Sequence, residues 1–305
     1  MSRRLAYVTL LTKASYLPGV LVLDHTLRSV NSAFPLVVMA THSLPEDTLG
    51  VLERRGIPIF PIASLHPPEG LHSLSSHDTR FTDTWTKLRA FELVEFERVI
   101  LLDADMIVMR NMDELFDIEM PPSWIAAAHV CACNPRKLPH YPSDWVPENC
   151  AYTPLVHPSS AAVITEQSPR PYTQLNSGLV VLSPSLYLAD EVRRHLFTSP
   201  LVSTWSFPDQ DLLSDLFRGR WKPLPWYYNA LKTLMVIHKP LWRDEEIRCL
   251  HYILADKPWH ARVSEDDTRE FAKSHRWWWD RLEQLGQEMK EETEEWKLVL
   301  ANVAH

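Results

Sequence analysis

Glycine is scarce in this chain, and its scarcity excludes several nucleotide-binding loops. Only seven of the 305 residues are glycine. No two of them have the spacing of a GxGxxG or a GxxxxGK[ST] sequence. The dinucleotide fingerprint, the Walker P-loop and the glycine-rich loop of protein kinases are therefore absent. Any nucleotide must be held by other means.

Basic residues and long apolar runs are also few. The 31 Lys and Arg residues are outnumbered by 39 Asp and Glu residues, which gives a net charge of −8. This balance argues against a nucleic-acid partner and against a polybasic membrane patch. No apolar run reaches the roughly 18 residues that span a bilayer, and the N-terminal segment lacks the apolar core of a signal peptide. We therefore expect a cytoplasmic protein that needs no membrane.

The spacing of the four cysteines predicts neither a disulfide framework nor a zinc knuckle. Cys131 and Cys133 form a C-x-C pair, whereas structural zinc sites typically use C-x2-C. Cys150 and Cys249 stand alone. We interpret all four as reduced thiols in a reducing compartment.

Apolar strands and amphipathic helices alternate through the first third of the chain. Strands are expected at 5–11, 36–41, 57–60 and 98–102, and helices at 15–30, 45–55 and 84–96. This alternation predicts an α/β fold with a parallel sheet and right-handed crossovers. A strand at 179–182 and helices at 184–197 and 209–218 follow later in the chain.

Residues 121–172 differ from the rest because ten of the chain's 24 prolines fall there. Long regular elements are not expected at that density. Trp145 and Tyr152 provide surface to bury, so we interpret the segment as an ordered insertion within one domain, residues 1–262. The remainder, 263–305, is expected to be a helical tail whose Trp277–Trp279 cluster packs on that domain.

The strongest chemical signal is Asp103-Ala104-Asp105, which ends the apolar strand 98–102. Ligands of open α/β sheets lie beyond the carboxyl ends of strands. Two carboxylates one residue apart repel each other unless a cation lies between them. Oxygen ligands suit Mg²⁺ or Mn²⁺. The sequence therefore predicts a metal site here, and a solvated acidic turn is the alternative.

Further polar residues follow at ends of apolar segments. Asn176-Ser177-Gly178 is expected before a strand, where glycine permits either a positive φ or the close approach of a ligand. Asp209-Gln210 opens a helix, where an N-cap is the ordinary role of an acid. His251 ends an apolar stretch and Lys257 follows six residues later. A core histidine and a solvated lysine are the ordinary alternatives.

In this order, the segments resemble glycosyltransferase family 8, the group of glycogenins and galactinol synthases, and the galactinol synthases look closest. The resemblance extends from about residue 5 to about residue 260. Its segments are Tyr7–Thr12 with Tyr16, Thr86–Leu88, Leu102–Asp105, Asn111–Asp117, Asn176–Gly178, Asp209-Gln210, Tyr228-Asn229, His251 and Lys257–Trp259.

The resemblance implies a GT-A fold, with a single Rossmann-like mixed sheet flanked by helices, and an enzyme that uses a UDP-sugar with Mn²⁺, or Mg²⁺, and retains the anomeric configuration. It also implies roles by matched position. The metal ligands are Asp103, Asp105 and His251. The nucleotide-sugar contacts are Leu10, Thr12, Tyr16, Arg80, Lys87, Ala104, Asn176, Ser177 and Lys257. Asp209, Lys87 and Gln210 are the implied catalytic residues.

The expected reaction is transfer of galactose or glucose from a UDP-sugar to a small polyol, such as myo-inositol, or to a glycan. A glycogenin-like self-glucosylating primer is the main rival, although residues 229–238, where such proteins carry an acceptor tyrosine, contain none. A non-catalytic nucleotide-sugar-binding scaffold and an unrelated metal-dependent hydrolase are weaker alternatives. A homodimer is an open option.

Overall fold

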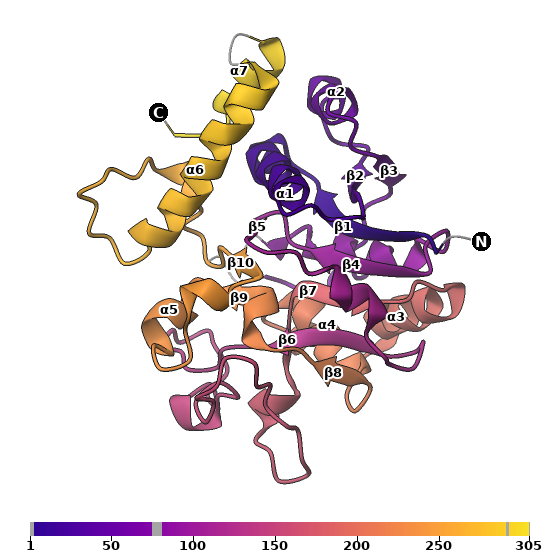
Figure 1. The fold of residues 1–305 in the computed structure, drawn as a ribbon. Coiled ribbons are helices and arrows are strands. Elements are labelled where there is room, and N and C mark those ends of the chain that lie inside the picture. Colours follow the sequence, from indigo (N-terminus) through magenta and orange to yellow (C-terminus); the bar gives the residue numbers. More distant parts are fainter. Residues whose placement is uncertain (1–2, 75–80, 291–292, 305) are drawn as a thin grey trace.

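The computed structural model describes residues 3–74, 81–290 and 293–304. At its centre is a seven-stranded mixed sheet in the order β3-β2-β1-β4-β7-β6-β8 (Figure 1). Its strands are β1 (Leu5–Leu11), β2 (Leu36–Thr41), β3 (Ile59–Ile62), β4 (Arg98–Leu102), β6 (Ile125–His129), β7 (Leu175–Leu182) and β8 (Trp221–Pro223). Only β7 runs antiparallel to its neighbours.

The apolar runs of β1, β2 and β4 form three adjacent parallel strands, as predicted. Thr9 of β1 is level with Val38 of β2 and with Leu102 of β4. These strands have uninterrupted apolar runs because side chains on both faces are buried. Their carboxyl ends therefore meet at one edge of the sheet, next to Asp103.

Helices cover both faces of the sheet and enclose two hydrophobic cores (Figure 1). Tyr7 and Ile100 belong to the core that includes α1 and α6, whereas Val8 and Leu101 belong to the core that includes α3 and α4. The alternation of side chains along each strand separates the two sets. The helices are α1 (Leu17–Ser29), α2 (Glu46–Arg54), α3 (Leu186–Thr198), α4 (Pro208–Leu216), α5 (Leu234–Ile237), α6 (Ala272–Met289) and α7 (Glu294–Leu300).

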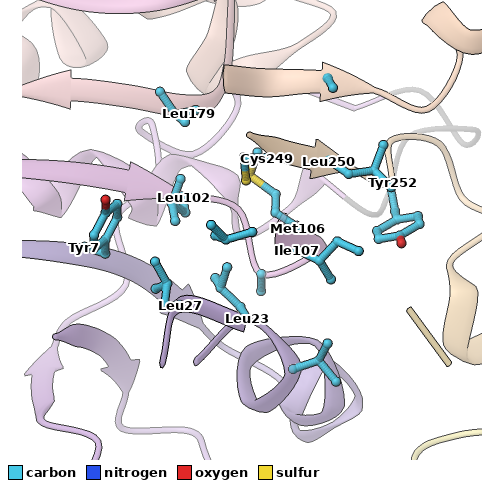
Figure 2. Close-up of a cluster of buried hydrophobic side chains, with 14 of the residues drawn as sticks. Tyr7, Leu23, Leu27, Leu102, Met106, Ile107, Leu179, Cys249, Leu250 and Tyr252 are labelled. Atoms are coloured by element: carbon cyan, nitrogen blue, oxygen red, sulfur yellow. The ribbon is translucent and has the colours of Figure 1, made fainter. Parts of the chain in front are cut away.

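A small second sheet, which the sequence did not indicate, lies beside the first. Its strands are β5 (Met106–Val108), β10 (Cys249–His251) and β9 (Ala230–Leu231), with β10 in the middle. Figure 2 shows Met106, Cys249 and Leu250 of this sheet packed with Leu23 of α1 and Leu102 of β4. Pairing of His251 with Met106 brings the histidine beside Asp105.

Several expectations differ from the structure. The strand expected at 57–60 is Ile59–Ile62. The helix expected at 84–96 is a 3₁₀ helix, Thr84–Glu92. β7 begins at Leu175, so Asn176-Ser177-Gly178 lies inside a strand and not before one. The proline-rich segment also contributes β6 to the main sheet.

In the tail, α6 buries Trp278 and Trp279, and the Trp279 indole N–H donates to the carbonyl of Pro258 at 3.0 Å. Of the helices in the described ranges, none is sufficiently long and apolar for a membrane crossing.

Candidate active site

Two carboxylates and an imidazole converge at the carboxyl end of β4. The Nε2 atom of His251 lies 3.6 Å from Oδ2 of Asp103 and 3.4 Å from Oδ1 of Asp105. Ligand atoms of the three residues all lie within 4.8 Å of one another. This donor set fits Mn²⁺, because carboxylates suit Mn²⁺ and Mg²⁺ while imidazole favours transition metals.

Two buried lysines compensate the carboxylates. The Nζ atom of Lys87 lies 2.7 Å from Oδ1 of Asp103 and 2.7 Å from Oδ2 of Asp209. The Nζ atom of Lys257 donates to Asp105 and, at 2.9 Å, to the carbonyl of Tyr252. Both ammonium groups are thus held inside the acidic cluster and not in solvent.

The pKa values of Asp103 and Asp105 are shifted in opposite directions. Burial raises the pKa of Asp103 and outweighs the opposing effect of Lys87. Burial acts on Asp105 in the same direction, but the Lys257 ammonium opposes it, and the pKa of Asp105 lies below its usual range. Burial would lower the pKa of Lys87, yet Asp103 and Asp209 raise it above its ordinary value. Lys87 therefore stays charged.

A chain of buried amides fixes the orientation of His251. Oδ1 of Asn229 lies 2.8 Å from Nδ1 of His251, and Nδ2 of Asn229 donates to Oδ1 of Asn176 at 2.7 Å. Asn176 in turn donates to Oε1 of Gln210 at 3.1 Å. Because the Asn229 amide nitrogen is engaged with Asn176, its oxygen accepts the Nδ1 proton. The Nε2 lone pair of His251 is then directed at the carboxylates, as in metal-bound histidines.

Asn229 was not predicted as a site residue. The only sequence signal for it was its place in the Tyr228-Asn229 segment of the family resemblance. The side chain is fully buried, and it connects β7 to β10 through Asn176 and His251. Asn229 orients His251, the candidate metal ligand, but does not itself line the cavity.

Gly178 permits the close approach of His251. A Cβ atom on Gly178 would lie 2.2 Å from Cε1 and 2.5 Å from Nδ1 of the imidazole. Such distances are far inside van der Waals contact, so no other residue fits without displacing the ring. Neither role expected for this glycine is seen, because its φ is not positive and the group that approaches it is a side chain of the same protein, not a ligand.

The residues predicted for the metal, nucleotide and sugar surround one cavity of about 520 Å³. Its lining includes Leu10, Thr12, Tyr16, Lys87, Asp103, Ala104, Asp105, Asn176, Ser177, Asp209, Gln210, His251 and Lys257. Arg80 lies outside the described residues. Segments separated by more than 200 residues in sequence thus meet at one site.

The part of the cavity lined by Tyr16 and Ala104 is closely packed. The Tyr16 ring contacts the Trp259 ring edge-on, with centroids 5.4 Å apart. A Cβ atom on Gly19 of α1 would lie 2.4 Å from the carbonyl oxygen of Ala104. Helix α1 can therefore approach the Asp103–Asp105 segment only because residue 19 has no side chain.

The cavity lining also includes an aromatic wall that the sequence did not predict. It consists of Tyr141 and Trp145 from the proline-rich segment and Phe207 from the residue before α4. The Trp145 and Phe207 rings are stacked, with centroids 5.1 Å apart and an interplanar angle of 11°.

The sequence model of glycosyl transferase family 8 matches residues 7–262. The chain belongs to glycosyltransferase family 8. Galactinol synthase 2 of Solanum lycopersicum is 30% identical over 281 residues, which is 90% of this chain and 79% of that protein. The protein is therefore a glycosyltransferase.

Solved structures agree on the fold at lower identity. The galactosyltransferase LgtC, solved with donor and acceptor sugar analogs, is 19% identical, with a TM-score of 0.61 over 97% of this chain and 100% of LgtC. GlyE of Streptococcus pneumoniae TIGR4 is 17% identical, with a TM-score of 0.57 over 94% of this chain. This chain spans 65% of the GlyE chain. The architecture is the GT-A fold, as expected.

Proposed function

We propose that this family 8 enzyme is a Mn²⁺-dependent, retaining transferase in the cytoplasm that moves galactose or glucose from a UDP-sugar to a small polyol such as myo-inositol. The observation that carries the proposal is the convergence of Asp103, Asp105 and His251 beside two buried lysines in one cavity. The galactinol synthase relatives support a polyol acceptor over a glycan.

The charges of the cluster suit a nucleoside diphosphate. Asp103, Asp105 and Asp209 contribute three negative charges, and Lys87 and Lys257 contribute two positive ones. With neutral His251 the balance is −1, and a divalent cation held by the metal triad makes it +1. When bound, Mn²⁺ would supply Lewis-acid stabilisation of the departing diphosphate. Lys257 would contact the same diphosphate.

Lys87 and Asp209 act as a pair on the donor sugar. Because Lys87 lies 2.7 Å from the Asp209 carboxylate, the negative charge of Asp209 is largely compensated. This favours a role in holding sugar hydroxyls over a role as a free nucleophile, and hence attack from the face of departure. Gln210, which accepts a hydrogen bond from Asn176, still has its amide N–H groups to offer the sugar.

The acceptor side favours a small diffusible acceptor over the protein itself. Thr233, Val236 and Ile237 contribute to the cavity lining in the segment where a self-glucosylating primer would carry its tyrosine. The aromatic wall of Tyr141, Trp145 and Phe207 provides apolar surface for the C–H face of a sugar or cyclitol. These features argue against the glycogenin-like alternative.

A donor and acceptor screen with the purified full chain tests the proposal. UDP release is measured with UDP-galactose and UDP-glucose, with and without Mn²⁺ and myo-inositol, and products are identified by mass spectrometry. We expect a hexosyl-inositol product that depends on Mn²⁺ and an unchanged intact protein mass. Stepwise hexose additions to the protein would establish the primer instead. UDP release that is independent of any acceptor would establish a hydrolase.

A further inference from the structure

A second cluster of metal-ligating side chains lies outside the glycosyl-transfer site. The Nε2 atom of His238 lies 3.5 Å from Sγ of Cys131, 3.2 Å from Sγ of Cys133 and 3.6 Å from Sγ of Cys150. All four ligand atoms lie within 4.8 Å of one another, and none of the cysteines forms a disulfide. The family resemblance gives these four residues no role.

The spacing agrees with the edges of a tetrahedron around zinc. Zn–S bonds of about 2.3 Å and Zn–N bonds of about 2.0–2.1 Å, at tetrahedral angles, place each sulfur about 3.5 Å from the nitrogen. The three observed S···N distances of 3.5, 3.2 and 3.6 Å lie around this value. Cys133, Cys150 and His238 are buried and Cys131 is half-buried, as in a closed site.

Hydrogen bonding alone does not explain the convergence. The Nε2 atom of an imidazole has either one proton or one lone pair, so it can form one good hydrogen bond to a thiol. Three sulfurs surround it here. A single cation at the centre would satisfy all four ligand atoms at once, because thiolate and imidazole are the ligands that structural zinc sites use.

We propose that Cys131, Cys133, Cys150 and His238 bind one structural Zn²⁺ ion. Binding releases three thiol protons to solvent and uses the neutral imidazole, so that the four protein ligands complete the coordination shell. With no open position for water, the ion would have no direct part in transfer. The proposal does not depend on the identity of the donor or the acceptor.

The positions of the ligands indicate what the ion does. Cys131 and Cys133 follow β6, Cys150 follows the 3₁₀ helix Pro147–Asn149, and His238 ends α5. The ion would therefore join the proline-rich segment to α5. Regular structure between β6 and β7 is limited to short 3₁₀ helices in the part of the chain that the structure describes, so such a clip would replace missing backbone pairing.

The clip would also shape the transfer cavity. The cavity lining includes Val130, Cys131 and Asn134 from the segment after β6, and Val236 and Ile237 from α5. The aromatic wall side chains Tyr141 and Trp145 lie in the chain between Cys133 and Cys150. Loss of the ion should therefore disturb the acceptor side more than the Asp103–Asp105 side.

Metal content of the purified full chain, measured by inductively coupled plasma mass spectrometry, tests the proposal. We expect about one zinc per chain after dialysis against EDTA, because a closed site exchanges slowly. Cys150→Ser and His238→Asn should lose this zinc. Two matched controls should keep it, namely Cys249→Ala, which removes the remaining buried cysteine, and Asp105→Asn, which disables the other candidate metal site.

Cobalt substitution gives a readout that does not depend on the folding of a variant. Wild-type protein in which Co²⁺ replaces the zinc should show thiolate-to-cobalt charge-transfer bands and the intense visible bands of a tetrahedral centre, and Asp105→Asn should show the same spectrum. The proposal is overturned if the purified wild-type protein contains no zinc and gives no such cobalt spectrum, although its four thiols react freely once it is unfolded. It is also overturned by zinc that Asp105→Asn loses and Cys150→Ser keeps, or by iron or copper in place of zinc.

Discussion

Gly178→Ala is the sharpest test of how the fold serves the transfer site. The added Cβ would lie 2.2 Å from Cε1 of His251, against about 3.5 Å or more for carbon atoms in contact. The imidazole cannot retreat freely, because its Nδ1 atom is bound to Asn229 at 2.8 Å. Either the ring loses this bond or β7 shifts away from β10.

Both responses carry a measurable cost. Insertion of a methyl group into a filled site costs about 1–3 kcal/mol of unfolding free energy. Loss of the hydrogen bond that orients a metal-binding histidine typically lowers metal affinity or activity about 10–100-fold. We therefore expect Gly178→Ala to lower Mn²⁺-dependent transfer about 10–100-fold and stability by about 1–3 kcal/mol.

Gly50→Ala is the matched control for this experiment. Gly50 lies inside α2, where a Cβ would meet only the flexible Arg54 side chain, at 3.1 Å. Alanine in a helix interior should stabilise the protein by about 0.5–1 kcal/mol and leave transfer unchanged. The assays are urea unfolding, calorimetric titration of Mn²⁺ with UDP, and turnover. A Gly178→Ala protein with wild-type metal affinity and turnover would refute the argument that the close approach positions His251.

Three further predictions concern charged groups. Asp103→Asn and Asp105→Asn should each lower the rate of transfer at least about a hundredfold, or roughly 3 kcal/mol. In urea unfolding only Asp105→Asn should be destabilised, because it leaves the Lys257 ammonium buried without its carboxylate. Equal stabilities of the two variants would contradict this. Lys257→Ala should weaken UDP binding in the presence of Mn²⁺ by about 1–3 kcal/mol. It should strengthen the binding of Mn²⁺ alone, because the lysine competes with the cation for Asp105. Calorimetry that finds both affinities changed in the same direction would contradict this. Burial and Lys232 lower the pKa of His275 from 6.5 to about 4. As the pH falls, the unfolded chain takes up the proton first, so the free energy of unfolding should fall by about 1–3 kcal/mol between pH 7 and pH 4. His275→Gln, which can still accept a hydrogen bond from Lys232, should flatten this decline, and an unchanged slope would contradict the assignment.

The sequence predicted the parts of the fold that depend on local pattern. The strands expected at 5–11, 36–41 and 98–102 have those bounds in the structure. Buried parallel strands are short continuous apolar runs, so their limits are visible where polar residues begin. The same rule located Asp103 and Asp105, because a strand that ends in two carboxylates is itself a local pattern.

What the sequence could not predict depends on contacts between distant segments. β6 and β8 pair with the main sheet although β6 has only five residues and β8 only three, the last of which is proline. The second sheet exists because β10 pairs with β5, about 140 residues earlier in the chain. Neither segment alone has the length or the apolar periodicity that indicates a strand.

The same limit applies to chemistry. His251 was identified as a candidate ligand because histidine is chemically distinctive, whereas Asn229, which orients it, is a residue type that ordinarily caps helices and forms turns. The C-x-C pair was set aside as a zinc site because zinc sites are recognised by ligand spacing along the chain. Here the third and fourth ligands, Cys150 and His238, come from separate segments, and only the folded chain brings them together.

The two lysines connect the fold to the binding of ligands. Folding brings three carboxylates into a buried site, which would be costly if their charges were unopposed. Lys87 and Lys257 oppose them in the protein alone, so the site can be preorganised before a donor arrives. A cation that takes Asp105 must displace Lys257, and a diphosphate gives the displaced ammonium a new partner. Metal and nucleotide should therefore bind more tightly together than either binds alone, and calorimetry should find this coupling weaker in Lys257→Ala, where only the direct attraction between the cation and the diphosphate is left.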